Sequence, residues 1–159
     1  MAIREEDVEG YRAAFDSVAR ERIYLGRLQA PPLEDVRKFV NEGLGKGRPQ
    51  FLGWVDERVV GWCDVVEKFP DLMRHSGNLG MGVVAAHRGR GIGTALMDAT
   101  LNAAKARGFK RIDLTVRTDN APARRLYERF GFEVEGVCRR HLLVDGEYHE
   151  SYLMSVLYD

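Results

Sequence analysis

The sequence predicts a mixed α/β fold in which helices cross between neighbouring strands. A strongly helical apolar pattern begins at Ile92, directly after a strand-like segment that ends at Ala85. A second alternating segment, Arg111–Arg117, follows that helix, as expected when a helix connects two strands of one sheet. Near the end of the chain, Asp145-Gly146 separates two long alternating segments, which is typical of a two-residue hairpin turn.

The first half of the chain predicts two helices and a group of short strands. A helical pattern covers residues 7–25, Pro31-Pro32 interrupts it, and a second helix is expected over Leu33–Gly43. The N-terminal edge would begin with a very short strand at Ala2–Arg4. Glycines inside a strand indicate a bulge or the close approach of another backbone. The remaining strands are expected over Phe51–Val55, Val59–Val66 and Leu79–Ala85, the last of which contains Gly80 and Gly82.

The second half predicts two further helices and the hairpin. The helix that starts at Ile92 is expected to end at Gly108, because glycine readily adopts the left-handed conformation that follows many helices. Asn120 can cap a shorter helix that has Pro122 in its first turn and is closed by Gly131. The two strands of the hairpin are expected over Phe132–Val144 and Glu147–Tyr158.

Composition excludes several classes of protein. The 159 residues, 45% of them apolar, suffice for one core, so we expect a single domain over residues 1–159. The 24 basic and 24 acidic residues cancel, whereas a general nucleic-acid binder needs a basic surplus. No apolar run approaches the ~20 residues of a membrane span, and no signal-peptide core is visible. Cys63 and Cys138 fit no metal-ligand spacing, so we expect a cytoplasmic protein without a metal, a nucleic-acid partner or a membrane partner.

The segment His87–Thr94 places three glycines and two arginines at the start of the central helix. A helix start has unpaired N–H groups and a partial positive charge, so it favours an anion. Glycines let a ligand approach the backbone, and arginines can reach phosphate oxygens. The segment lacks the Lys of a P-loop, and Leu96 stands where a dinucleotide loop has its third glycine. It therefore predicts a cradle for a phosphorylated ligand; the alternative is a loop whose glycines only make a sharp turn.

Arg88-x-x-Gly91-x-Gly93, between a strand and a helix, resembles the signature with which Gcn5-related N-acetyltransferases (GNATs) bind the pyrophosphate of acetyl-coenzyme A. The resemblance covers roughly residues 53–157. It implies a central mixed sheet of six to seven strands, flanked by about four helices, that splays open before the strand Arg111–Arg117. The pantetheine arm would lie in that gap. Further matching segments are Leu114-Thr115-Val116, Asn120-Ala121-Pro122-Ala123, Leu126-Tyr127 and Gly131-Phe132.

The resemblance also assigns residues to the acetyl-CoA site. The loop would hold the pyrophosphate, and a backbone N–H freed by the splay at Val83 or Val84 would stabilise the oxyanion. Asn120 would bond to the pantetheine arm, a role compatible with its capping of the helix. The expected donor-binding residues are Val83, Val84, Arg88, Gly89, Arg90, Gly91, Ile92, Gly93, Thr94 and Asn120.

Acetyl transfer to an amine also needs an acid for the departing sulfur and a base or water for the amine. Tyr127 is the candidate acid, because family members place a tyrosine there; packing in the core is the alternative. Some members carry a catalytic Glu on the strand before the loop, but here residues 79–84 contain no acid. The base could be a water chain or one of four side chains: Glu67, His75, Glu147 and Glu150.

The acceptor is the most open question. Asp64, Glu67 and Asp71 could attract a cationic amine, or they could form a solvated rim. The compact chain favours a small amine or an amino acid as acceptor. The alternatives are a protein N-terminus or lysine, a non-catalytic acyl-CoA-binding module, and a nucleotide-binding protein with the same cradle. By resemblance, the final hairpin would form a homodimer.

Overall fold

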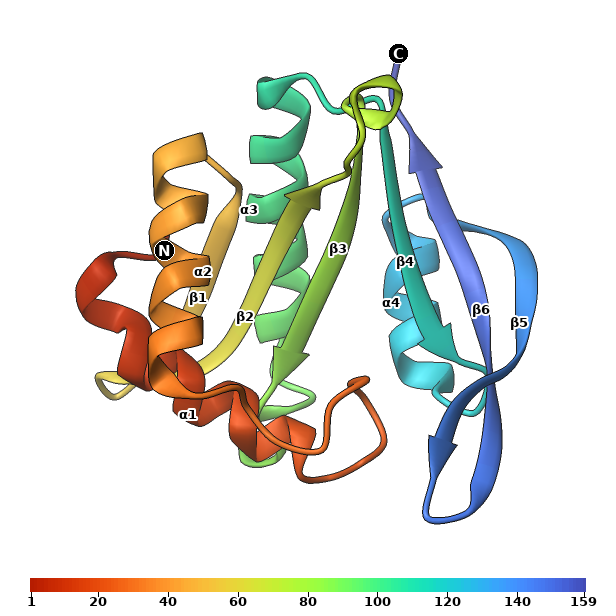
Figure 1. Ribbon diagram of the computed structural model, residues 1–159, viewed down its shortest axis with the longest axis horizontal. Helices are drawn as coiled ribbons and strands as arrows, with labels where there is room; N and C mark the ends of the chain where they lie inside the picture. Colours follow the sequence, from red (N-terminus) through yellow and green to blue (C-terminus); the bar gives the residue numbers. More distant parts are fainter.

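The computed structural model describes residues 1–159 and contains one six-stranded sheet in the order β1-β2-β3-β4-β6-β5 (Figure 1). All neighbouring strands are antiparallel except β3 and β4. The strands are β1 (Gln50–Val55), β2 (Arg58–Glu67), β3 (Ser76–Val83), β4 (Arg111–Arg117), β5 (Glu133–Val144) and β6 (Glu147–Leu157). The helices are α1 (Val8–Ala19), α2 (Leu33–Lys46), α3 (Ile92–Arg107) and α4 (Ala121–Arg129). The expected mixed sheet with four helices is confirmed.

Two apolar clusters hold the helices against opposite faces of the sheet. Under α3 and α4, Met97 and Phe132 pack against Ile112 and Met154, which project from β4 and β6. Under α1 and α2, Val8 and further helix residues pack against the other face of β1 and β2. These α1 and α2 contacts stop at β3, so neither helix covers β4, β5 or β6 on that face. None of the helices is long and apolar enough to cross a membrane.

The sheet opens between β3 and β4. These two strands pair over only three positions, the last of which joins Asn78 to Asp113, whereas β2 stays paired with β3 as far as Val83. Figure 1 shows the two strands diverging beyond this point. The expected splay is therefore present, and the free edges of two parallel strands face one another across a gap.

Several element boundaries differ from the sequence expectations; α2, for example, ends at Lys46 and not at Gly43. The first helix ends at Ala19, and Ile23 is 42% exposed, because the chain turns at Arg22, which has a positive φ of 60°. The strand expected at Ala2–Arg4 is a single bridge to Phe51. Strand β3 begins at Ser76, three residues before the expected start, because pairing with β2 and β4 holds polar residues in the sheet. Long-range pairing thus overrides the local apolar pattern.

Candidate active site

The loop before α3 presents main-chain N–H groups that no side chain caps. Gly91 is the N-cap of α3 in the left-handed conformation (φ 81°), and Gly89 also has a positive φ of 74°. A Cβ at either position would meet nothing within 4 Å, so the backbone conformation, not lack of space, requires glycine. The first bond of the helix runs from Ala95 N–H to the Gly91 carbonyl. The N–H groups of the first turn are therefore available to an anionic ligand.

A cavity of about 480 Å³ opens in front of this helix start and extends into the gap between β3 and β4. The loop before α3, the strands β3 and β4, and helix α4 all contribute residues to its wall. Nine of the residues expected from the sequence line it: Val83, Arg88, Gly89, Gly91, Ile92, Gly93, Thr94, Asn120 and Tyr127. Val84 and Arg90 do not. The sequence reading missed Val18 and Tyr24, which reach the cavity from α1 and the loop after it. It also missed Arg129 and Arg117, of which Arg117 is paired with both carboxylate oxygens of Asp119.

The expectation that the splay frees the Val84 N–H is wrong. This group donates to the carbonyl of Val60 on β2, with an N–O distance of 2.8 Å. Backbone N–H groups alternate between the two edges of a strand, so the N–H of Val83 points toward the gap instead. Of the two expected oxyanion donors, only Val83 keeps that role as a prediction.

Arg88 lies in the cavity wall but is already bound by protein groups. Its guanidinium donates to both carboxylate oxygens of Glu21 at 2.8 and 2.5 Å and to the Val83 carbonyl at 2.9 Å. It also lies over the Tyr24 ring, with Cζ 4.3 Å from the ring centroid. Arg88 thus ties the loop after α1 to the mouth of the gap, and any contact with phosphate would compete with Glu21.

Tyr127 combines the two roles expected of it. It is 8% exposed and packs against Phe132, with ring centroids 6.0 Å apart, yet it lines the cavity. Burial raises the pKa of the Tyr127 phenol, so the group stays protonated at neutral pH, the state that an acid needs. Asn120 caps α4 as expected, because its side-chain oxygen accepts a hydrogen bond from Ala123 N–H at 3.3 Å.

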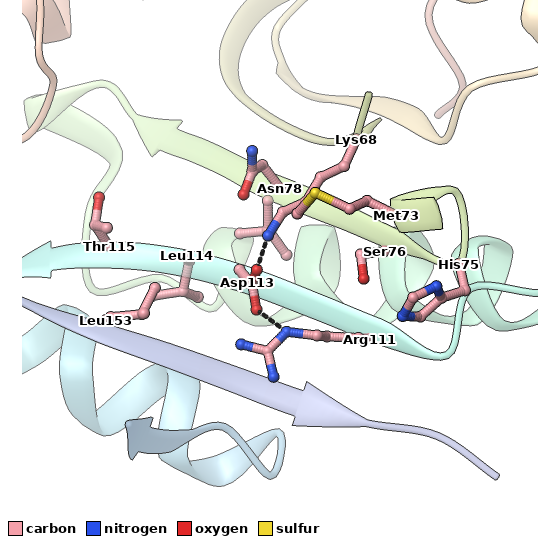
Figure 2. Close-up of a pocket in the computed structure, with 11 residues that line it drawn as sticks. Lys68, Met73, His75, Ser76, Asn78, Arg111, Asp113, Leu114, Thr115 and Leu153 are labelled. Carbon is pink, nitrogen blue, oxygen red and sulfur yellow. Dashed lines mark hydrogen bonds and ion pairs between the residues drawn. The ribbon is translucent and has the colours of Figure 1, made fainter. Parts of the chain in front are cut away.

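A second cavity, of about 590 Å³, lies over β3 and β4 (Figure 2). Lys68 and Arg111 both form ion pairs with Asp113 at its centre, and the Arg111–Asp113 distance is 2.7 Å. Arg111, Asp113 and Thr115 alternate with core residues of β4, so they face away from α3 and α4. Thr115 lines both cavities. The two cavities therefore meet at the gap.

The four side chains considered as bases lie in different environments. His75 is exposed and lines the second cavity. Glu67 accepts hydrogen bonds from Arg48, which lower the pKa of its carboxyl to about 2 and make it too weak a base at neutral pH. Glu147 and Glu150 are exposed on β6 and line neither cavity. Of the four, only His75 lines either cavity, and it lies at the paired end of β3 and β4, away from the gap.

A parted sheet with uncapped amides at one cavity and a charged second cavity defines an enzyme of the acyl-transfer class. The model of the acetyltransferase (GNAT) family matches residues 14–132. The chain therefore belongs to the GNAT acetyltransferase family, and the resemblance drawn from its motifs is confirmed.

Individual relatives agree with this family. The chain is 30% identical over 156 residues (98% of this chain and 96% of the relative) to the L-amino acid N-acetyltransferase AaaT of Escherichia coli K12. It is 32% identical over 142 residues (84% and 83%) to an N-alpha-acetyltransferase of Sulfurisphaera tokodaii.

Solved structures show the same fold at lower identity. A ribosomal-protein-alanine N-acetyltransferase of Brucella melitensis superposes with a TM-score of 0.93 at 21% identity, covering 99% of this chain and 98% of that one. The acetyltransferase yncA of Salmonella typhimurium, crystallised with its cofactor acetyl-CoA, superposes with a TM-score of 0.94 at 16% identity, covering 100% and 92%. No three His, Cys, Asp or Glu side chains gather into a group that could hold a metal ion.

Proposed function

We propose that this GNAT acetyltransferase transfers the acetyl group of acetyl-CoA to the α-amine of a small amino acid. The observation that carries the proposal is the meeting of two different cavities at Thr115 in the gap between β3 and β4. The 30% identity with the E. coli L-amino acid N-acetyltransferase, over nearly the whole chain, supports an amino acid as acceptor.

The first cavity suits the donor. The uncapped amides at the start of α3 fit a diphosphate, and Arg129 adds a cation to the same wall. The free edge of β3, with the Val83 N–H directed into the gap, can pair with the amides of a pantetheine arm. Bound there, acetyl-CoA would supply an activated thioester for attack by the acceptor amine.

The second cavity suits a zwitterionic acceptor. Lys68 and Arg111 both pair with Asp113, and Arg111 also pairs with Glu135 at 2.8 Å. The carboxylate of an amino acid would therefore share these two cations with Asp113 and Glu135. In the transfer, the amine nitrogen forms a bond to the acetyl carbon, and the carbon–sulfur bond breaks. Tyr127 can give its proton to the departing sulfur from the α4 side. An oxyanion at the carbonyl would accept a hydrogen bond from Val83 N–H.

The test is the release of free thiol by purified protein, measured with acetyl-CoA and a panel of amines. L-amino acids, their amides, short peptides and a protein with an N-terminal alanine form the panel. We expect release that depends on the acceptor and is fastest with free amino acids. Faster release with peptides would favour acetylation of protein N-termini, which the name of the S. tokodaii relative suggests. Binding of CoA without release by any amine would mean a non-catalytic module.

Three further expectations belong to this proposal. Residues 1–159 would act as one domain, because a single sheet joins both halves of the chain. The protein would form a homodimer through the hairpin of β5 and β6, where Val137, Leu143 and Tyr148 are exposed. Light scattering in solution tests the dimer. The cytoplasmic location and the lack of nucleic-acid and membrane partners remain predictions from the sequence.

A further inference from the structure

Asp64, in the middle of β2, is a buried carboxylate without a partner. It is 7% exposed, and no ion pair or hydrogen bond reaches its side chain. Burial of an unpaired charge is costly, so proteins seldom retain one without a reason. A titratable group in such a place is a candidate for chemistry when it also lies next to a site.

Asp64 lies beside the place where the sheet opens. It pairs in register with Gly80, which follows the last β3–β4 pair, Asn78 with Asp113, by two residues. The Asp64 Oδ1 atom lies 3.5 Å from the position that a Cβ on Gly80 would occupy. Gly80 has no side chain, so only the backbone of β3 lies between this carboxylate and the gap; Asp64 itself lines neither cavity. Alternation along the strands puts Asp64, Gly80 and Asn78 on the face of the second cavity, which Asn78 lines.

The opposite face at the same level carries Tyr127. Cys63 precedes Asp64 in β2 and therefore points to the other side of the sheet, where it belongs to the same buried cluster as Tyr127. Asp64 and Tyr127 thus approach the gap from opposite faces. An acetyl transfer needs this separation, because the amine gives up a proton on one side and the sulfur takes one on the other.

The surroundings of Asp64 leave it able to titrate. Arg48, just before β1, is bound by both oxygens of Glu67 at 3.0 and 2.9 Å, so its charge acts on Asp64 only from a distance. α1 contributes the buried phenol of Tyr11, and β3 contributes only Gly80. Burial raises the pKa of the Asp64 carboxyl to about 7, while Arg48 opposes the shift. Asp64 can therefore both bind and release a proton near neutral pH.

We propose that Asp64 is the general base of this enzyme, reaching the acceptor across the bare backbone of Gly80. The proposal rests on the proposed function. The ammonium group of the acceptor gives one proton to the Asp64 carboxylate and becomes a neutral amine, which attacks the thioester carbon. The second nitrogen proton passes to water as the amide forms, and the sulfur leaves as a thiol with the proton of Tyr127. Tyr127 then regains a proton from water and Asp64 gives its proton to water, so each turnover releases one proton. Some family members carry a catalytic Glu on the strand that corresponds to β3. In this protein, Asp64 on β2 would provide the carboxylate instead.

The decisive experiment is the pH dependence of kcat/KM for an amino acid in the wild type and in Asp64→Asn. In the wild type we expect kcat/KM to rise through about pH 7, as Asp64 loses its proton, and then to level off. In Asp64→Asn the reaction needs an amine that is already neutral, so kcat/KM should keep rising to the pKa of the amine. The variant should be about 100-fold slower at pH 7, should approach the wild type at alkaline pH, and should bind CoA unchanged.

Glu67→Gln is the matched variant, because it removes a carboxylate from the same strand. It should keep the rise in kcat/KM but move it to lower pH, because Arg48 is then free to approach Asp64 and stabilise its charged form. This shift also tests the proposal if Asp64→Asn fails to fold. An unchanged pH profile in Asp64→Asn, or a profile that Glu67→Gln abolishes, overturns the proposal while the acetyltransferase function stands. A wild type that releases no thiol with any amine overturns both.

Discussion

The two cavities that meet at the gap present different kinds of chemistry. The cavity in front of α3 presents backbone groups to a ligand: N–H groups of a helix start, glycines in the left-handed conformation and the open edge of β3. The cavity over β3 and β4 is built from charged side chains, with Lys68, Arg111 and Asp113 at its centre. A site made of backbone should fail when the backbone conformation changes, whereas a site made of side chains should change its specificity one residue at a time.

Gly91→Asp should have the largest effect. A non-glycine residue is strained at a φ of 81°, and the new carboxylate would repel a diphosphate at the helix start. We expect donor affinity to fall by more than about 100-fold, measured by calorimetry with acetyl-CoA, while the circular dichroism spectrum is retained. Gly45→Asp is the matched control, since Gly45 lies in α2 with nothing within 4 Å of its Cβ position and no positive φ. Undiminished acetyl-CoA binding in Gly91→Asp would mean that the loop does not bind the diphosphate.

Tyr127→Phe tests whether the reaction needs the Tyr127 hydroxyl, a side-chain group in the cavity in front of α3. Removal of the hydroxyl keeps the ring packed on Phe132, so the fold and the donor affinity should hardly change. We expect kcat to fall by about 100-fold, because the thiolate then leaves without an acid. Stopped-flow measurement of thiol release gives kcat, and calorimetry gives the affinity. An unchanged kcat in this variant would mean that Tyr127 is not the acid and only packs in the core.

Lys68→Met should alter the choice of acceptor and leave the donor untouched. Loss of a charged hydrogen bond of about 1.5–3 kcal/mol should raise KM for amino acids by about 10- to 100-fold. The KM for the corresponding amino acid amides, which carry no carboxylate, should change little. Equal effects on acids and amides would mean that Lys68 supports the cavity through Asp113 and does not bind the acceptor.

Glu21→Gln should have the smallest effect. Glu21 holds the Arg88 guanidinium beside the donor cavity, and its negative charge opposes an incoming diphosphate. The pair is half-buried, but the incoming diphosphate would be free to bind Arg88 in place of Glu21, so we expect donor affinity to rise only by about 5-fold. Glu9→Gln on α1 is the control, since Glu9 is exposed and forms no ion pair. A fall in donor affinity would show instead that Glu21 is needed to position the loop after α1.

The sequence by itself determined the parts of the molecule that short-range physics controls. The start of α3 at Ile92, the Asn120 cap and the Asp145-Gly146 turn all lie where the local patterns placed them. Each depends on a few neighbouring residues whose backbone preferences are strong. For the same reason the glycines predicted the turn before α3, where Gly89 and Gly91 adopt a conformation that few other residues adopt.

Only the tertiary structure decided which distant residues meet. The sequence left Asp64 as one of three acids that either attract an amine or form a solvated rim, and it contained no sign that Gly80 would leave Asp64 open to the gap. The sequence also contained no sign that Glu21, 67 residues away, binds the Arg88 guanidinium at the cavity wall. Pairing between strands and helix packing bring these groups together. Such long-range contacts depend on the register of the whole sheet, which no short stretch of sequence specifies.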